Sequence, residues 1–176
     1  CHVHSSFSSD SETPVEAMIE KAIAQGRKYF YLTDHHDLDY PIGEDGRDFI
    51  LPLDRYTTRL EQLRAQYASQ IEVRIGVELG LMAQIQEKTE AFAASYPFDF
   101  IIGSSHLVHG QDPYYAEYYQ GKTERQAYEE YFLSILENVK TFDCFHVYGQ
   151  LDYVIRYGPN KDKFYQPLDY YDIFKE

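Results

Sequence analysis

The chain has 176 residues, of which 44% are hydrophobic and 16% aromatic, so it can form one folded domain and is not a disordered segment. Its formal net charge of −13 provides no basic stripe to displace counterions, which argues against nucleic acid as the main partner. It has no signal peptide, no apolar run of membrane length and only two cysteines, so we expect a cytoplasmic protein without a membrane partner.

Short apolar runs alternate with longer amphipathic ones along the chain. A helix is expected after Thr13, which would cap it, with Pro14 in its first turn and Gly26 at its end. The other expected elements, in chain order, are a strand at 29–33, a helix at 54–67, a strand at 71–77, a helix at 84–95, a strand at 98–102, a helix at 123–140 and a strand at 144–148. This alternation predicts parallel strands with right-handed crossovers, which fits a barrel or a doubly wound sheet.

Residues able to bind metal ions follow the predicted strands. His35 follows the strand at 29–33, Glu78 the one at 71–77, His106 the one at 98–102 and Gln150 the one at 144–148. In a parallel barrel, the carboxyl ends of the strands meet at one mouth. We therefore expect these side chains to form one polynuclear metal site rather than to lie scattered over the surface.

His2 and His4 stand two positions apart at the start of the chain. If this segment is extended, both imidazoles point to one side, where they suit zinc, manganese or iron. Cys1 adjoins the pair, but the alternation of side chains points it away from the histidine face. Asp10, six residues after His4, is either an oxygen ligand or part of the turn before the next helix, and both alternatives stay open.

Glu78 lies between apolar residues and glycines, where its carboxylate would be buried. A buried carboxylate needs a partner, and a bridging position between two metal ions would supply one. A salt bridge to an arginine is the alternative. His106 follows an almost wholly apolar strand and is either a ligand of a second metal ion or a core histidine bonded to the backbone.

His35 and His36 are adjacent, so only one of their imidazoles can face the site. We expect this to be His35, with Asp37 as a supporting residue of the following loop. His146 falls inside a predicted strand on the side away from the site, which indicates a structural role.

Four segments of this chain resemble motifs of the PHP (polymerase and histidinol phosphatase) family, and they occur in family order: His2-Val-His4, Thr33-Asp-His35, Gly76-Val-Glu78 and Ser-His106. The resemblance covers essentially the whole chain and favours the histidinol-phosphatase branch. It implies an α/β fold, a distorted (βα)7 TIM-like barrel, with three divalent metal ions (zinc, manganese or iron). The implied ligands are His2, His4 and Glu78 for one ion, Glu78 and His106 for a second, and His35 with Asp10 for a third.

The resemblance also implies an activity, which is hydrolysis of L-histidinol phosphate, a small phosphate monoester, to L-histidinol in histidine biosynthesis. Glu78, His106 and Arg156 are the candidate catalytic residues, and Arg156 and Ser104 the candidate substrate-binding ones. Arg156 occupies the place of a family arginine that binds phosphate. Clustered metal ions would neutralise the phosphate dianion and activate a water molecule, and an arginine adds bidentate contacts.

The sequence departs from the family pattern in two ways. Gln150 stands where the family usually has a histidine; its carbonyl oxygen is a candidate but poorer metal ligand. The family's late Asp-x-His motif is absent from these 176 residues, and barrels of this kind have about 250 residues. We therefore expect residues 1–176 to be one PHP domain that is incomplete at both ends and lacks its C-terminal strands.

Two alternatives to the histidinol-phosphatase interpretation stay open. One is a PHP phosphoesterase with another substrate, such as a nucleotide or a 3′ end. The other is a degenerate PHP module that binds metal without turnover, a possibility that Gln150 raises. The sequence does not indicate an oligomeric state.

Overall fold

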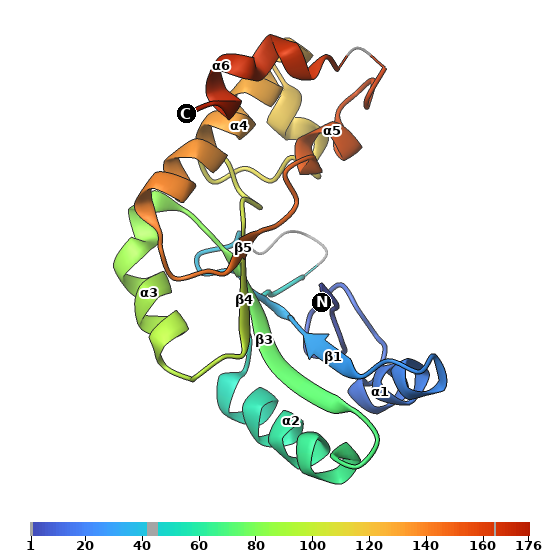
Figure 1. The fold of residues 1–176 in the computed structure, drawn as a ribbon. Helices are drawn as coiled ribbons and strands as arrows, with labels where there is room; N and C mark the ends of the chain where they lie inside the picture. The colour runs from blue at the N-terminus through green and yellow to red at the C-terminus, as the bar shows by residue number, and fades with distance from the viewer. Residues whose placement is uncertain (1, 42–45, 164) are drawn as a thin grey trace.

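A parallel β-sheet with helices packed against it forms the framework of the chain in the computed structural model, which describes residues 2–41, 46–163 and 165–176 (Figure 1). Four strands lie side by side in the order β1 (Tyr29–Leu32), β3 (Glu72–Gly80), β4 (Phe100–Ser104) and β5 (Val147–Tyr148). The short strand β2 (His35–His36) also pairs with β3. Every pairing is parallel, so the predicted α/β arrangement is confirmed, and over the described residues the sheet stays open.

Helices connect β2 to β3, β3 to β4 and β4 to β5, as the alternating pattern predicted, and further helices precede β1 and follow β5. They are α1 (Val15–Ala24), α2 (Leu53–Tyr67), α3 (Gln86–Ala94), α4 (Glu124–Thr141), α5 (Tyr153–Tyr157) and α6 (Tyr171–Phe174), with short 3₁₀ turns η1 (Ala83–Ile85), η2 (Ala116–Tyr119) and η3 (Pro167–Tyr170). Figure 1 shows α3 and α4 along one side of the sheet and the N-terminus on the other. No helix in the described part of the chain is long and apolar enough to cross a membrane.

The helix ends follow the sequence signals only in part. Helix α4 begins with a full capping box, in which Thr123 and Gln126 bond to each other's backbone amides. The predicted Thr13 cap of α1 is wrong, because Pro14 occupies the cap position and no side chain caps the helix. Gly26 ends α1 as predicted, with a φ of +68° that favours glycine.

Strand β3 is longer than predicted and runs to Gly80, so Glu78 lies inside the strand rather than after it. The extension is possible because β3 has partners on both sides, including β2 at His35 and β4 at Ile102. Strand β5 is correspondingly shorter than predicted. His146 precedes it and accepts a hydrogen bond from the Ile101 amide through Nδ1 (3.0 Å), which supports the predicted structural role.

Successive side chains of β3 point alternately to the two faces of the sheet. Val73, Ile75, Val77 and Leu79 are completely buried in the main hydrophobic core, which includes the α2 side chains. Glu78 lies in the same strand with the opposite parity, so it points to the other face of the sheet. The same pattern that builds the core therefore aims one carboxylate away from it.

A second hydrophobic cluster joins α4, α5 and the segment before α4, and it is rich in tyrosine. Tyr118, Tyr128 and Tyr131 are almost fully buried in it together with Phe132 and Val154. The Tyr131 hydroxyl donates to the Gln150 carbonyl (2.8 Å), so this cluster also fixes the chain that follows β5. Of the two cysteines, Cys144 is a half-buried free thiol, and Cys1 lies outside the described residues.

Candidate metal centre

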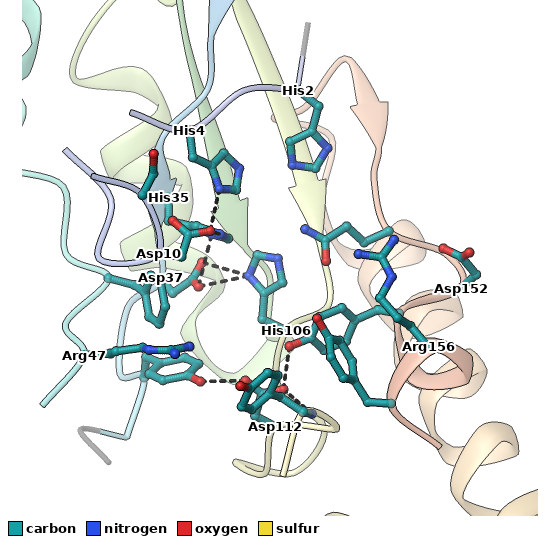
Figure 2. Close-up of a pocket in the computed structure, with 17 residues that line it drawn as sticks. His2, His4, Asp10, His35, Asp37, Arg47, His106, Asp112, Asp152 and Arg156 are labelled. Atoms are coloured by element: carbon teal, nitrogen blue, oxygen red, sulfur yellow. Dashed lines mark hydrogen bonds and ion pairs between the residues drawn. The ribbon is translucent and has the colours of Figure 1, made fainter. Parts of the chain in front are cut away.

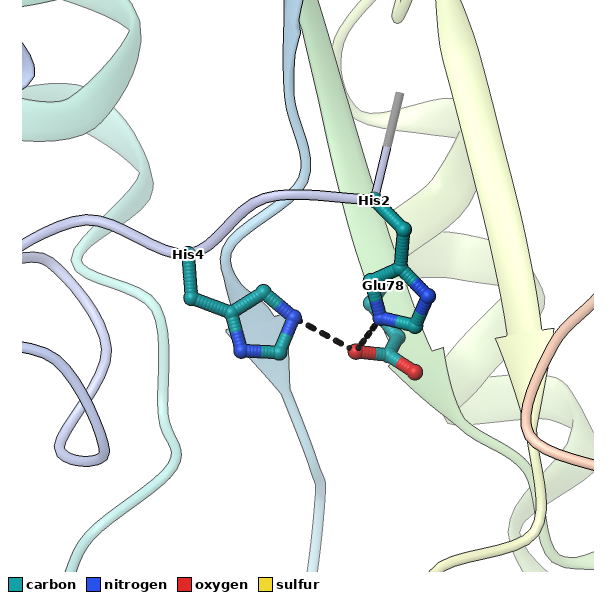
Figure 3. Close-up of side chains that lie close together, drawn as sticks. All are labelled: His2, His4 and Glu78. Atoms are coloured by element: carbon teal, nitrogen blue, oxygen red, sulfur yellow. Dashed lines mark hydrogen bonds and ion pairs between the residues drawn. The ribbon is translucent and has the colours of Figure 1, made fainter. Parts of the chain in front are cut away.

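Glu78 is the centre of the site, and the opening histidines converge on it (Figure 3). Its side chain is fully buried, and its Oε2 lies 2.8 Å from His2 Nε2 and 2.9 Å from His4 Nε2. The segment between the histidines runs beside the end of β1, where the Thr33 amide donates to the Val3 carbonyl (3.0 Å). This extended pairing places both imidazoles on one side, so the predicted orientation of the His2–His4 pair is confirmed.

The other carboxylate oxygen of Glu78 is held from the neighbouring strands. Oε1 accepts hydrogen bonds from Ser104 Oγ (2.6 Å) and Gln150 Nε2 (2.9 Å) and lies 3.3 Å from His106 Nε2. None of these partners is an arginine, so the salt-bridge alternative for Glu78 is wrong among the described residues. The contact also gives His106 a role in the site beyond that of a core histidine.

Asp10 joins the site from the loop that precedes α1. Its Oδ2 lies 2.9 Å from His4 Nδ1 and 3.6 Å from His35 Nε2. The two imidazoles therefore share one carboxylate oxygen. This placement favours the ligand alternative for Asp10 over a purely local turn.

His35 and His36 face opposite environments, as predicted. His35 is buried in the site, with Nδ1 3.6 Å from Glu78 Oε2. His36 instead stacks on Phe92, with ring centroids 3.5 Å apart, and accepts the Leu51 amide through Nδ1 (3.1 Å). Burial lowers the pKa of His36 to about 4, so it remains a neutral packing residue.

Asp37 orients His106. Its Oδ2 lies 2.9 Å from His106 Nδ1, and both side chains are almost fully buried. A histidine that meets a carboxylate with one ring nitrogen keeps the other free for a metal ion, and here Nε2 faces Glu78. The geometry supports the predicted supporting role for Asp37, although it also belongs to a third possible ligand group with His35 and His106.

The donor set fits divalent cations. Three groups of side chains have potential ligand atoms within 4.8 Å of one another, and they share members: His2, His4 and Glu78; His4, Asp10 and His35; His35, Asp37 and His106. Buried His4 Nε2 and His35 Nδ1 have no hydrogen-bond partner among the described residues, although carboxylates lie nearby. Ligand atoms around tetrahedral zinc are about 3.3 Å apart, which the observed contacts bracket.

Ionised groups dominate this cluster. Burial opposes ionisation of Glu78, but contacts with His106, His2 and His4 hold its pKa well below the usual range. Burial likewise opposes the charge on His4, but Asp10 and Glu78 raise its pKa to about 9. The carboxylates are thus ready to bind cations, whereas His4 must lose a proton to do so.

The residues of the three ligand groups, apart from the fully buried Glu78, line one end of a cavity of about 610 Å³ (Figure 2). The rest of its wall comes from polar and aromatic side chains, among them Tyr40, Asp112 and Tyr153, and from Arg156 on α5. Arg156 is exposed in the cavity, and no carboxylate in the described part of the chain lies within ion-pair distance of its guanidinium. It is therefore placed to receive an anionic group.

Ser104 and Gln150 both act on Glu78 in this structure. Ser104 is fully buried and does not line the cavity, because its hydroxyl is directed at Glu78. Gln150 lines the cavity with a φ of 53°, but its amide nitrogen, not the predicted carbonyl ligand, faces Glu78. The placement of Ser104 argues against the predicted substrate contact and favours a role in positioning Glu78.

Sequence reasoning missed the polar residues at the far end of the cavity. Asp112 is almost fully buried and accepts hydrogen bonds from the Tyr40 and Tyr153 hydroxyls. These three residues come from distant parts of the chain and share no motif. Among so many tyrosines, nothing in the sequence distinguishes the two that reach this carboxylate.

Comparison with known proteins identifies relatives over nearly the whole chain. The model of the PHP domain matches residues 1–176. The histidinol-phosphatase of Lactococcus lactis subsp. lactis (strain IL1403) is 37% identical over 92% of this chain, and a probable histidinol-phosphatase of Clostridium acetobutylicum is 29% identical over 99%. This chain covers 59% and 65% of those proteins, less than two thirds of each.

Solved structures match the fold as well. A crystal structure of histidinol phosphate phosphatase from the same Lactococcus lactis strain, in complex with zinc, L-histidinol and phosphate, superposes with a TM-score of 0.90. The two are 36% identical, and the match covers 98% of this chain and 64% of the other. A putative histidinol phosphatase from Listeria monocytogenes matches with a TM-score of 0.64 at 22% identity, over 81% of this chain and 61% of that chain, which supports the fold alone. The predicted fold class is confirmed, and the chain belongs to the PHP domain family.

Proposed function

We propose that this chain carries the metal centre and substrate cavity of a metal-dependent phosphatase that hydrolyses L-histidinol phosphate to L-histidinol and phosphate. The observation that carries the proposal is the convergence of four histidines and three carboxylates, His2, His4, His35, His106, Asp10, Asp37 and Glu78, on one end of a cavity that also exposes Arg156. The relatives named histidinol-phosphatase support the choice of substrate.

The protein would hold its divalent ions through overlapping groups of side chains, and Glu78 would belong to two of them. His2, His4 and Glu78 would bind one ion, Glu78 and His106 a second, and His35, Asp10 and His4 a third. Zinc is favoured because a relative was crystallised with it, and the imidazole-rich donor set suits it. When bound, such ions neutralise the phosphate dianion and lower the pKa of a water molecule.

The side chains of this chain would bind and orient the substrate around those ions. Arg156 would donate to the phosphate oxygens as a planar, permanently charged group. Ser104 and Gln150 would fix the Glu78 carboxylate, and Asp37 would fix the ring of His106, so that the ligands do not have to reorganise. The cavity would direct the alcohol portion of the ester toward Asp112 and the tyrosines.

The two alternative functions are weaker on specific grounds. A nucleotide or a 3′ end would bring further anionic groups into a cavity that already contains Asp112 and Asp152. A module without turnover would explain Gln150, but it would not explain Arg156, which has no carboxylate partner among the described residues and lines the same cavity as the metal-binding groups.

The test is hydrolysis of L-histidinol phosphate together with metal content, compared between His106→Asn and His109→Asn. The two variants carry the same substitution three residues apart, and His109 lies exposed outside the cavity with a φ of 52° that asparagine tolerates. We expect His106→Asn to lose more than about 100-fold in activity and to bind less zinc, and His109→Asn to match the wild type. Zinc binding without phosphate release by the wild type would refute the phosphatase proposal.

A further inference from the structure

Asp34 is a fully buried carboxylate that lies between β1 and β2, directly before His35, and it does not line the cavity. Its backbone carbonyl accepts a hydrogen bond from the Glu78 amide (3.0 Å), which ties it to β3 at the central carboxylate of the site. A carboxylate in such a buried place is costly unless its oxygens accept hydrogen bonds. The partners of its side chain therefore indicate what the residue does.

The side chain of Asp34 is bonded to the loop that follows His4. Oδ1 accepts hydrogen bonds from the Ser5 amide (2.6 Å) and the Ser8 hydroxyl (3.0 Å), and Oδ2 accepts one from the Ser5 hydroxyl (2.9 Å). Both serines are almost fully buried, and the loop belongs to no helix or strand. These bonds to a buried carboxylate therefore fix the path of the loop where regular secondary structure does not.

Ser8 connects this loop to a metal-binding histidine. Its hydroxyl donates to Asp34 Oδ1 and accepts a hydrogen bond from the His35 amide (2.8 Å). A hydroxyl has only one proton, so the bond to Asp34 leaves its lone pairs for the His35 amide. The loop, Asp34 and the backbone of His35 are thus held together by one side chain.

The loop anchored by Asp34 connects two metal-binding residues, His4 and Asp10. Asp10 Oδ2 lies 2.9 Å from His4 Nδ1 and 3.6 Å from His35 Nε2, so the three side chains converge (Figure 2). The side chain of Asp10 is 34% exposed, against 14% for His4 and 9% for His35. Asp10 lies on no strand, so its position depends on the path of the loop.

We propose that Asp34 is a positioning residue for the metal centre, which acts through the two buried serines of the loop. It holds His4, Asp10 and His35 in the arrangement that binds one divalent ion, so these ligands do not reorganise when the ion binds. The proposal rests on the proposed function, which assigns an ion to this group. Groups that orient metal ligands typically contribute about 10- to 100-fold to metal affinity.

The experiment compares the zinc affinity of Ser8→Ala and Ser6→Ala with that of the wild type, by competition with a chromophoric chelator. Both variants lose one hydroxyl from the same loop, but Ser6 is exposed and does not line the cavity. We expect Ser8→Ala to lower the affinity for one ion about 10- to 100-fold and to leave the remaining ions within about 3-fold. Ser6→Ala should match the wild type, and an equal loss in both variants would overturn the proposal.

Asp10→Asn identifies which ion Ser8 affects. It removes the carboxylate ligand itself, so it should weaken the same ion as Ser8→Ala. If Ser8 acts through this ligand group, adding Ser8→Ala to Asp10→Asn should lower zinc affinity by less than about 3-fold further. Losses that simply multiply in the double variant, or that spread over all the ions, would contradict the assigned role.

Urea unfolding of the zinc-free variants separates positioning from stability. A merely structural role would make Ser8→Ala easier to unfold but leave the zinc affinity of the folded protein unchanged, and that result would refute the proposal. Asp34→Asn tests the carboxylate directly, because it replaces one acceptor oxygen by a donor, and we expect the same selective loss. Should Asp34→Asn not fold, Ser8→Ala decides the question.

The outcome is separable from that of the proposed function. If the wild type binds no zinc, the proposed metal centre itself fails. If the wild type binds zinc and Ser8→Ala binds it equally well, only the role of Asp34 fails.

Discussion

His4 illustrates how a single residue in this site balances two demands. It lies between the carboxylates of Asp10 and Glu78, which favour its protonated form. The same two carboxylates belong to the groups that would bind metal ions. A cation at this position therefore competes with a proton for the His4 imidazole.

Metal binding should release protons at neutral pH. Without a bound cation, the pKa of His4 is raised to about 9, so its ring is protonated at pH 7 and must be deprotonated to act as a ligand. The apparent zinc affinity should therefore rise about tenfold per pH unit for each proton released and level off above the pKa. Calorimetry of zinc binding in buffers of different ionisation enthalpy measures the protons released.

A His4→Gln variant provides the control for this measurement. It removes the titrating ring, so zinc binding to the remaining ligands should be weaker and should release fewer protons. Equal proton release by the wild type and the variant would show that His4 is not the group displaced by the metal ion.

At the residue scale, the sequence predicted the metal-binding residues better than the residues that position them. His2, His4, His35, Glu78 and His106 are predicted as ligands because they stand near predicted strand ends or in recognisable motifs, and Asp10 as a ligand or a turn residue; the structure brings all six together. The orientation of Gln150 and Ser104 toward Glu78 was not predictable. It depends on hydrogen bonds between strands that are distant in the sequence.

At the scale of elements, β3 determines the geometry of the site. It carries Glu78, pairs with β2 at His35 and approaches Asp37 at Gly80. A side chain at Gly80 would collide with the carboxylate of Asp37, the group that orients His106. The strand can pass this close to the loop only because position 80 has no Cβ atom.

Gly80→Ala should therefore weaken metal binding without direct contact to any ion. The added methyl group would displace Asp37, leave His106 without its orienting carboxylate and lower zinc affinity about 10- to 100-fold. Gly121→Ala is the control, since its φ of +73° strains alanine but nothing lies within 4 Å of the new methyl group. Competition with a chromophoric chelator measures both affinities, and an unchanged value for Gly80→Ala would contradict the argument.

The hydrophobic pattern of the sequence predicts which helices exist better than it predicts where the strands begin and end. All predicted helices exist, since their apolar spacing reflects burial in the main core or, for α4, in the tyrosine-rich cluster. Strand boundaries were less accurate: β3 was predicted too short and β5 too long. The end of a strand depends on whether a neighbour is present to pair with it, and that information is not local in the sequence.

At the scale of the whole molecule, the site joins segments that are far apart along the chain. The opening segment contacts β3 through His2 and His4, and the chain after β5 contacts the same strand through Gln150. These contacts meet at one buried carboxylate. A cation bound there would link the opening segment to β3 directly and, through the Glu78–Gln150 hydrogen bond, would hold the chain that follows β5.

Zinc should therefore stabilise the entire fold and not only the local site. A ligand that binds the folded state alone adds about 2.7 kcal/mol to the free energy of unfolding at 100 times its dissociation constant. Urea unfolding at increasing zinc concentration should show this rise, with the m-value nearly constant because the same surface is exposed. His106→Asn should show a smaller rise, and His109→Asn the full one. Specific binding of an ion to the folded state must raise the free energy of unfolding. If this free energy does not depend on zinc in the wild type, the converging histidines and carboxylates do not bind zinc specifically.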